Sequence, residues 1–371
     1  MLKVSFYSYK GGSGRSTTAW NTIERLIYNS DEPDLRPTAE EPFVIVDADL
    51  QSAGSTFLYN AYYEFIEDRN EQLPSFQKRI TTPSMIDYTD PEARKKFFRS
   101  MHPIGDYFSR RGTEKKIENE AVLFMGVNLN IKTTNAVDNI GGEKSEAQKG
   151  NFRTNILAPC ELLGVKALFF DTPSGTQFWA QNCVLQSDVI VCCMRPTDQF
   201  REGTIRQLRS FIEEDGKNRE VGRRKYILTP TAVCFDKNKD EDNNPVAPIY
   251  QKNGGGVARE YPIYAKEEIN KLFGLGGEQK IELREAFANN VVQDMMRPTD
   301  AEISMYSGSE SEDNADVFGI PEIKRFKWYE ECLGNLPELQ LDKNDKMGLR
   351  RYEHLARAIK RYYNELPAED E

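Results

Sequence analysis

Short apolar runs recur along this chain, separated by longer stretches that are polar or have helical spacing. The main runs lie within 2–9, 43–50, 121–128, 166–171, 188–194 and 223–233. Runs of this kind are typical of strands buried on both faces of a parallel sheet. After the first run, Ala19, Ile23, Leu26 and Ile27 recur at the spacing of one helix face. The pattern predicts an α/β fold, with a doubly wound, mostly parallel sheet, helices on both faces and polar insertions.

The segment that follows the first expected strand reads YKGGSGRSTT over 9–18. Its glycines let the backbone turn so that successive N–H groups point to one place, and the helix that begins near Ser16 adds the positive end of its dipole. This arrangement favours an anionic phosphate. Compared with G-x-x-x-x-G-K-[ST], Arg15 stands at the lysine and Tyr9 at the first glycine. The alternative is a glycine-rich turn between strand and helix that binds nothing.

Carboxylates stand at the ends of two later strands. Asp47 and Asp49 are two residues apart, which directs both to one side, and Asp171 ends the run KALFFD. Strand ends of this kind face the ligand crevice of a doubly wound sheet. The alternative is that these aspartates only cap the helices that follow them.

Composition excludes some classes of protein. The chain has 371 residues, a formal net charge of −10 and only two histidines. The overall field therefore repels nucleic acid and anionic membranes, so that any DNA contact needs a local basic patch. Six cysteines without a C-x-x-C pair indicate reduced, buried thiols. Without a signal-peptide pattern or a run of ~18 apolar residues, we expect a soluble, cytoplasmic protein.

Taken together, three segments resemble the motifs of one family. KGGSGRST is similar to the deviant Walker A motif, DADLQ to the D-x-D-P-Q segment and DTP to the Walker B end of the ParA/MinD family of partitioning and positioning ATPases. They occur in the family's order, each at the end of an expected strand. The resemblance implies a P-loop NTPase fold, ATP and Mg²⁺ as cofactors, and a homodimer that forms with nucleotide.

The resemblance also implies roles for individual residues. The phosphates would be bound by Gly11, Gly12, Ser13, Gly14, Arg15, Ser16 and Thr17. Mg²⁺ would be held with the help of Ser16, Asp47 and Asp171. The expected catalytic residues are Asp49, which would position the attacking water, and Lys10, which would cross the dimer interface to the phosphates of the other subunit.

The chain departs from the family at two points of these motifs. Leu50 replaces the proline of D-x-D-P-Q, and Arg15, wider than lysine, is expected to hold phosphate with slower chemistry. We expect one domain over 1–371, with insertions near 60–150 and 235–340 that the resemblance does not cover. The sequence further predicts a helix over 151–165 and, by composition, a loop over 236–256.

Two expected helices allow more than one interpretation. A helix over 91–111 has a basic face that could meet DNA or an acidic partner, or could simply be solvated. A basic, amphipathic helix over 346–366 could bind membrane, as in MinD-type relatives, or pack on the sheet, as in ParA-type relatives. The acidic end LPAEDE favours packing and makes a membrane partner unlikely.

Two functions follow from these expectations. The first is an ATP-binding, nucleotide-dependent dimerisation switch with slow hydrolysis in partitioning, positioning or a related regulatory complex. Its expected partner is a protein, with DNA as a further candidate. The alternative is a nucleotide-binding scaffold or sensor subunit of a defence or regulatory complex, with little or no hydrolysis.

Overall fold

The computed structural model describes residues 1–28, 35–63, 75–84, 86–109, 116–127, 143–195, 200, 203–204, 206–208, 210–211, 214, 224–232, 238–239, 245–246, 291–292, 320–327 and 331–365. The chain divides into two compact units. Unit 1 comprises residues 1–7, 15–188 and 330–338, and unit 2 comprises residues 8–14, 189–329 and 339–371.

The described strands of unit 1 form a sheet in the order β1-β5-β2-β4-β3. Their bounds are Leu2–Tyr7 for β1, Phe43–Asp47 for β2, His102–Pro103 for β3, Val122–Met125 for β4 and Ala167–Asp171 for β5. Pairing is parallel throughout except between β3 and β4. This mostly parallel order places β1, β5 and β2 side by side, so that the three predicted motifs follow neighbouring strands.

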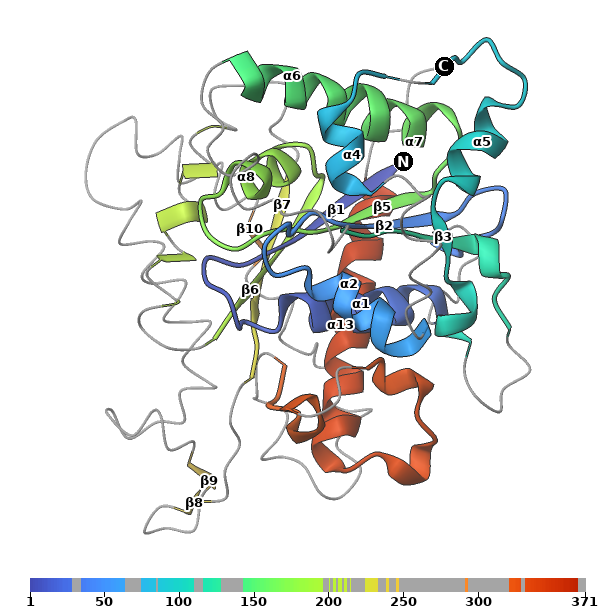
Figure 1. Ribbon diagram of the computed structural model, residues 1–371. Helices are drawn as coiled ribbons and strands as arrows, with labels where there is room; N and C mark the ends of the chain where they lie inside the picture. Colours follow the sequence, from blue (N-terminus) through green and yellow to red (C-terminus); the bar gives the residue numbers. More distant parts are fainter. Residues whose placement is uncertain are drawn as a thin grey trace. The chain divides into compact units, whose positions relative to one another are not determined.

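Helices cover both faces of this sheet (Figure 1). One face carries α4 (Phe76–Thr81), α6 (Glu143–Phe152), the π-helical turn η4 (Arg153–Leu157), α7 (Ala158–Leu162) and α8 (Phe178–Leu185). The other face carries α1 (Arg15–Tyr28) and α2 (Gly54–Tyr63). Further short elements are α5 (Ala93–Arg99) and the 3₁₀-helices η2 (Gly105–Phe108), η3 (Asn119–Ala121) and η10 (Leu333–Asn335). The arrangement confirms the predicted α/β class.

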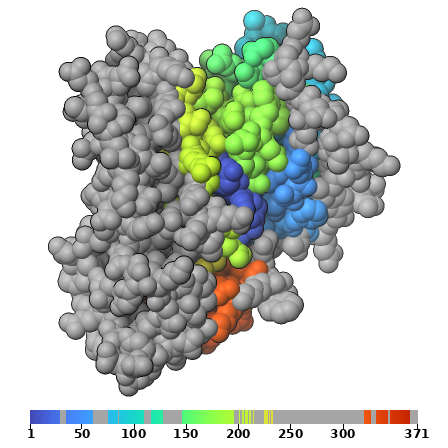
Figure 2. Space-filling view, turned by 90° about the vertical axis from the view of Figure 1, so that its left-hand side faces the viewer, coloured from blue at the N-terminus to red at the C-terminus, as the bar shows by residue number. Residues whose placement is uncertain are grey.

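Two segments of unit 1 that lie far apart in the sequence meet at its surface. In the space-filling view, the blue surface around α2 adjoins the green surface of the residues after β5 (Figure 2). Gln177 donates a hydrogen bond to Gln51 across this boundary, at 3.0 Å. The turns that follow β2 and β5 are therefore neighbours, as expected for adjacent parallel strands.

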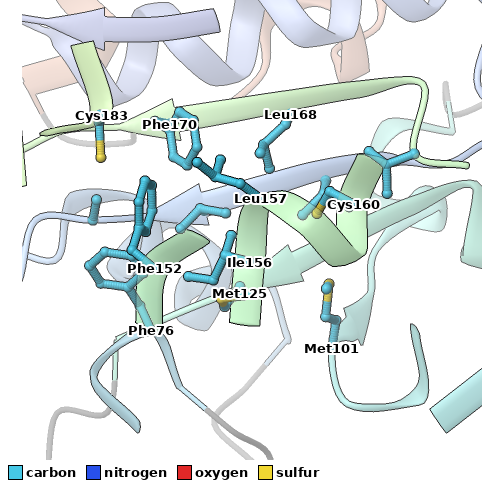
Figure 3. Close-up of a cluster of buried hydrophobic side chains, with 14 of the residues drawn as sticks. Phe76, Met101, Met125, Phe152, Ile156, Leu157, Cys160, Leu168, Phe170 and Cys183 are labelled. Carbon is cyan, nitrogen blue, oxygen red and sulfur yellow. The ribbon is translucent and has the colours of Figure 1, made fainter. Parts of the chain in front are cut away.

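A hydrophobic core fills one side of the sheet (Figure 3). Alternate residues of β2 and β5, among them Val44, Val46, Leu168 and Phe170, point into it and are fully buried. The helices of that face contribute Phe76, Ile80, Phe152, Ile156, Leu157, Cys160, Trp179 and Cys183. Because successive side chains of a strand alternate between faces, Asp47 and Asp171 must project to the opposite side, where α1 and α2 lie.

On that opposite side, Trp20 of α1 is the central side chain. Its ring packs edge-on against Tyr107 at 4.9 Å between centroids and contacts Phe108 and Phe124 at 5.7 Å. Trp20 is 1% exposed. This aromatic cluster fixes α1 on the sheet, which in turn fixes the start of α1 next to the strand ends.

The segment around η10 crosses α1 from a distant part of the sequence. Leu333 N–H donates to Asn21 Oδ1 at 2.8 Å, and the Asn21 side-chain amide donates to the Glu331 carbonyl at 3.3 Å. Asn335 donates to the Tyr107 carbonyl at 2.6 Å. At Gly334 a Cβ atom would lie 2.1 Å from Glu24 Oε1 and from Arg25 Nη2, so a larger residue would displace this ion pair.

Unit 2 contains three parallel strands among its described residues, in the order β10-β7-β6. Their bounds are Val189–Met194 for β6, Lys225–Pro230 for β7 and Val291–Val292 for β10. A separate antiparallel pair is formed by β8 (Asn238–Lys239) and β9 (Pro245–Val246), within a stretch that the sequence indicated as loop. Further helical segments near the C-terminus are the 3₁₀-helices η9 (Lys324–Lys327) and η11 (Glu338–Gln340) and the helix α13 (Lys343–Glu365).

The apolar stripe of α13 is buried. Tyr352, Leu355, Ile359 and Tyr362 are all less than 8% exposed, and Lys225 lies over the Tyr362 ring at 5.3 Å. The stripe is thus engaged within the protein, which favours packing over membrane binding. In the part of the chain that the structure describes, every helix is too short or too polar to cross a bilayer.

Two predicted helices are wrong in their bounds. The helix expected over 91–111 ends at Arg99, and the chain then enters the two-residue strand β3. In α5, Phe97 is buried, while Lys95 and Lys96 form ion pairs with Glu92 and Asp90. These pairs favour the interpretation of a solvated surface. The helix expected over 151–165 begins earlier, at Glu143, and is interrupted by the π turn before Pro159.

Several predictions lie outside the described residues. They include Arg110 and Arg111 of the basic face and most of the insertions expected near 60–150 and 235–340. The single domain over 1–371 also stays a prediction. The five cysteines that the structure describes are buried and take part in no disulfide among the described residues, as expected for reduced thiols.

Phe152 provides a test of the core. Its ring contacts Phe170 and Trp179 at 5.7 Å and 5.6 Å and is 2% exposed, so Phe152→Ala should lower the free energy of unfolding by about 3–5 kcal/mol. The control is Phe57→Ala, because Phe57 is 55% exposed. Urea unfolding followed by circular dichroism measures both. Equal losses in the two variants would contradict the assigned core.

Candidate active site

The strand register of unit 1 brings the predicted carboxylates together. In the parallel pairing of β2 with β5, Asp47 stands opposite Asp171. Asp49 follows two residues later, in the turn before α2. All three side chains are at most 2% exposed. The strand ends therefore hold three carboxylates in a space from which water is largely excluded.

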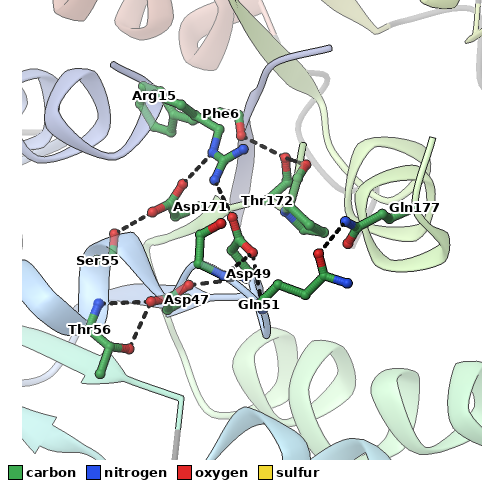
Figure 4. A network of polar contacts seen from close by, with 12 residues as sticks. Phe6, Arg15, Asp47, Asp49, Gln51, Ser55, Thr56, Asp171, Thr172 and Gln177 are labelled. Atoms are coloured by element: carbon green, nitrogen blue, oxygen red, sulfur yellow. Dashed lines mark hydrogen bonds and ion pairs between the residues drawn. The ribbon is translucent and has the colours of Figure 1, made fainter. Parts of the chain in front are cut away.

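Arg15 joins two of these carboxylates (Figure 4). It is the first residue of α1, and its Nε donates to Asp171 Oδ1 at 2.7 Å while its Nη2 donates to Asp49 Oδ2 at 2.7 Å. The Arg15 side chain is 8% exposed. The guanidinium thus forms a buried bridge between the Walker A, D-x-D and Walker B segments that the sequence singled out separately.

Arg15 remains charged in this environment. Burial on its own would lower the pKa of Arg15, but the attraction of Asp171 and Asp49 and the hydrogen bonds to both outweigh burial and raise the pKa above its usual value. A permanent positive charge is therefore fixed between the two carboxylates.

The other oxygen of Asp171 is also engaged. Ser55 Oγ donates to Asp171 Oδ2 at 2.7 Å and accepts a hydrogen bond from Trp20 Nε1 at 2.8 Å. Ser55 is fully buried. Trp20 and Ser55 thus orient Asp171 from the side of α1 and α2. Ser55 was not among the predicted site residues, although its hydroxyl lies only six residues after Asp49 and directly after Gly54 in the sequence.

Asp47 accepts hydrogen bonds from the start of α2. Its Oδ2 accepts from Thr56 N at 2.8 Å and Thr56 Oγ1 at 2.7 Å, and its Oδ1 accepts from Asp49 N at 3.1 Å. Thr56 Oγ1 in turn accepts from Val127 N at 2.9 Å. Burial and the nearby charge of Asp171 raise the pKa of Asp47, while the bonds from Thr56 act in the opposite direction. These contacts favour the interpretation of Asp47 as a helix cap.

Asp49 fixes the turn between β2 and α2. Its Oδ1 accepts from the backbone N–H groups of Gln51 at 3.2 Å and Ser52 at 2.9 Å, and its Oδ2 takes the Arg15 bond. The carboxylate is therefore oriented on both sides. An acid that is held in this way is suited to orient a reacting group.

Gly54 lets α2 approach the start of α1 closely. A Cβ atom at Gly54 would lie 2.3 Å from Ser16 Oγ and 3.8 Å from Asp171 Oδ2. Only glycine leaves room for the Ser16 hydroxyl at this point. Thr17, the next predicted residue, is 6% exposed in the first turn of α1. Within unit 1 the structure thus places Arg15, Ser16, Asp47, Asp49 and Asp171 around one centre.

The predicted phosphate loop, residues 8–14, belongs to unit 2. Gly12 and Gly14 have φ values of +74° and +71°, and an added Cβ would meet nothing within 4 Å at either. Backbone conformation, rather than crowding, therefore requires glycine at both positions. Gly11, Gly12 and Gly14 are exposed, whereas Ser13 is buried. Exposed backbone in left-handed turns is what a phosphate loop needs.

Unit 2 anchors this loop from behind. Arg195 Nε donates to the Gly12 carbonyl at 2.8 Å, and Thr231 Oγ1 donates to the Ser13 carbonyl. Lys10, the predicted catalytic lysine, lies over the Phe200 ring at 5.9 Å. The contacts of Arg195 and Thr231 with the loop could not be predicted, because they join residues 183 and 218 positions apart in the sequence.

Comparison with solved structures identifies the fold. pNOB8 ParA superposes with a TM-score of 0.54 and 14% sequence identity, covering 98% of this chain and 99% of ParA. This chain has the ParA fold. The same ParA bound to nonspecific DNA gives a TM-score of 0.48 at 13% identity, covering 99% and 100% of the two chains. MinD from the Aquifex aeolicus MinC:MinD complex gives 0.47 at 10% identity, covering 100% and 99%.

At these identities the ParA likeness establishes the fold alone. No protein-family model matches the chain, and no curated protein is significantly similar to it. The assignment agrees with the order of the three motifs and with the parallel order of β1, β5 and β2 in unit 1. The chemistry of this ParA-type chain must be argued from its own residues.

The residues of this site fit Mg²⁺ only together with further oxygen ligands. Mg²⁺ usually takes one or two carboxylates and completes its shell with water and substrate phosphates. Among the described residues, no group of three or more histidine, cysteine, aspartate or glutamate side chains is arranged to hold a metal ion by itself. Ser16 and Asp171 supply suitable oxygens, but both oxygens of Asp171 accept hydrogen bonds, from Arg15 and Ser55. Both oxygens of Asp47 likewise accept hydrogen bonds, from Asp49 and Thr56.

A substitution of Thr56 tests how much its hydrogen bonds to Asp47 and Val127 stabilise the protein. Thr56→Val keeps the shape of the side chain but removes its bond to Asp47 and leaves Val127 N–H without an acceptor, so the free energy of unfolding should fall by about 1–3 kcal/mol. In the control Thr154→Val, an exposed hydroxyl that bonds only within its own helix is lost. Chemical unfolding compares the two. If Thr56→Val lowered the free energy of unfolding as little as the control, the hydrogen bonds of Thr56 would not stabilise the protein.

Proposed function

We propose that this chain is an ATP-binding switch that dimerises with nucleotide and hydrolyses ATP slowly. The observation that carries the proposal is the buried bridge of Arg15 with Asp49 and Asp171, which joins the ends of three separate motifs. Phosphoryl transfer depends on positioning and charge neutralisation, and the bridge places two oriented carboxylates and a cation at the start of the helix that follows the loop glycines. The ParA fold supports the same reaction class.

Each residue of unit 1 takes a part that its contacts allow. Ser16 lies beside Gly54 at the start of α1, where its hydroxyl can serve as a ligand. Asp171, oriented by Ser55, would help to hold Mg²⁺, and Asp49 would orient the attacking water. Bound Mg²⁺ supplies neutralisation of the charge on the β and γ phosphates. Asp47 supports the site through Thr56.

Lys10 would act between two copies of the chain. The loop glycines would hold the phosphates, and Lys10, which precedes them, would reach the nucleotide of the other subunit. A protein partner would then read the dimeric state. pNOB8 ParA was solved on nonspecific DNA and MinD in complex with MinC, so that DNA and protein partners are both open to test.

One observation favours the alternative, a nucleotide sensor without turnover. Arg15 commits two N–H donors to the carboxylates that would hold Mg²⁺ and orient water. If this bridge persists with nucleotide bound, binding proceeds and hydrolysis does not. Phosphate release by the wild type therefore separates the switch from the sensor.

Dimerisation is tested with Lys10→Ala. Wild type with ATP and Mg²⁺ should shift from monomer to dimer in light scattering, whereas Lys10→Ala should bind a fluorescent ATP analogue and remain monomeric, because the lysine that crosses the interface is gone. Lys149→Ala, which removes an exposed lysine of α6, is the control. A Lys10→Ala protein that dimerises as tightly as wild type would rule out the lysine-bridged dimer.

Hydrolysis is tested with Asp49→Ala and Ser16→Ala. Wild type should release phosphate below the usual enzyme range of ~1–10³ s⁻¹. Asp49→Ala should keep nucleotide binding and lose release, since only turnover needs the oriented water. Ser16→Ala should weaken binding about tenfold or more through the lost hydroxyl ligand. The assignment of roles fails if both variants lose binding equally, and a wild type that binds but releases no phosphate supports the sensor.

A further inference from the structure

Arg15 occupies an unusual position for a residue expected to bind phosphate. It follows Gly14 directly, yet its side chain turns to the strand ends and bonds to Asp171 and Asp49 at 2.7 Å each. The bonds come from Nε and Nη2, so the fork of the guanidinium spans the two carboxylates (Figure 4). A residue of the phosphate motif thus serves as counter-ion to the catalytic acids.

These charges depend on one another. Arg15 is 7% exposed, Asp49 2% and Asp171 1%. Removal of one member of a buried ion pair leaves an uncompensated charge at a high cost in stability. Arg15 therefore cannot leave the carboxylates unless another anion receives the guanidinium and another cation receives the carboxylates.

We propose that Arg15 locks the site and is released by an exchange of partners. The inference rests on the proposed function and adds its regulation. A nucleotide triphosphate accepts the N–H donors of Arg15, and the divalent cation that accompanies it takes the place of Arg15 at Asp171. Arg15 and Asp171 each keep a partner of opposite charge in both arrangements, and Asp49 keeps its hydrogen bonds from the backbone N–H groups of Gln51 and Ser52. Asp49, freed from Nη2, then becomes available to the water.

The fork geometry of Arg15 makes this exchange selective. Guanidinium donors match carboxylate and phosphate oxygens equally well, so phosphate is a suitable substitute anion. A divalent cation that binds without a nucleotide would displace Arg15 from Asp171 and leave the buried guanidinium without an anionic partner. The ion pairs of Arg15 are thus released only by a nucleotide that binds together with its metal ion. Because two ion pairs must rearrange, turnover is slow.

The test is a double-mutant cycle on thermal stability with Arg15→Gln, Asp49→Asn and the double variant. Neighbouring residues that interact give non-additive effects. Without nucleotide, each single variant should lower the unfolding midpoint by roughly 5 °C or more, and the double variant by clearly less than the sum. With saturating non-hydrolysable ATP analogue and Mg²⁺, the two shifts should become additive.

A second buried pair of the same helix gives a matched control. Glu24 and Arg25 of α1 are ion-paired, and Arg25 is 7% exposed, as is Arg15. The cycle of Glu24→Gln with Arg25→Gln should show the same non-additivity with and without the analogue. This control separates the exchange at Arg15 from a general stabilisation of the protein by its ligand.

The outcomes distinguish the lock from the function on which it rests. Binding of a fluorescent ATP analogue is measured in parallel for every variant of the Arg15 cycle. Retained non-additivity at Arg15 while the analogue is bound overturns the lock but leaves the ATP switch standing. If the shifts of the unfolding midpoint are additive without nucleotide, Arg15 and Asp49 do not interact and the lock is overturned as well. If wild type does not bind the analogue, the proposed function fails and the lock fails with it.

Discussion

The arrangement of unit 1 depends on how its buried negative charge is compensated. Three aspartates meet at the ends of β2 and β5, and the guanidinium of Arg15 is bonded to two of them. Buried carboxylates without a partner would strongly oppose folding. The position of α1 is therefore constrained from two directions, by the apolar contacts of Trp20 along its length and by the ion pairs of Arg15 at its start.

The two faces of β2 and β5 have different tasks. Val46 and Phe170 join a dry core of aromatic and aliphatic side chains, while their neighbours in sequence, Asp47 and Asp171, face α1 and α2. Because side chains alternate between the two faces of a strand, consecutive residues serve the hydrophobic core and the polar site. Ser55 and Thr56 complete the polar side by donating to Asp171 and Asp47, which orients the acids from the start of one helix.

Much of this could be predicted from the sequence. The apolar runs indicated the strands, and the aspartates at their ends were expected to face the ligand crevice of the sheet. The partners of Arg15 could not be predicted, because a motif fixes the position of a residue but not the direction of a flexible side chain. The helix bounds at 91–111 failed for another reason. Apolar and basic residues continue beyond Arg99 at helical spacing, but the pairing of β3 with β4 overrides the local preference.

The crossing of α1 by the η10 segment affects how the chain is made. Asn21 finds its partner N–H at Leu333, 312 residues later. During synthesis this side of α1 therefore stays uncovered while a further 312 residues are added, and Asn21 must be hydrated in the meantime. Such distant closure is slow because loop entropy must be overcome before the contact forms. The segment that covers this side of α1 is thus translated long after α1 itself.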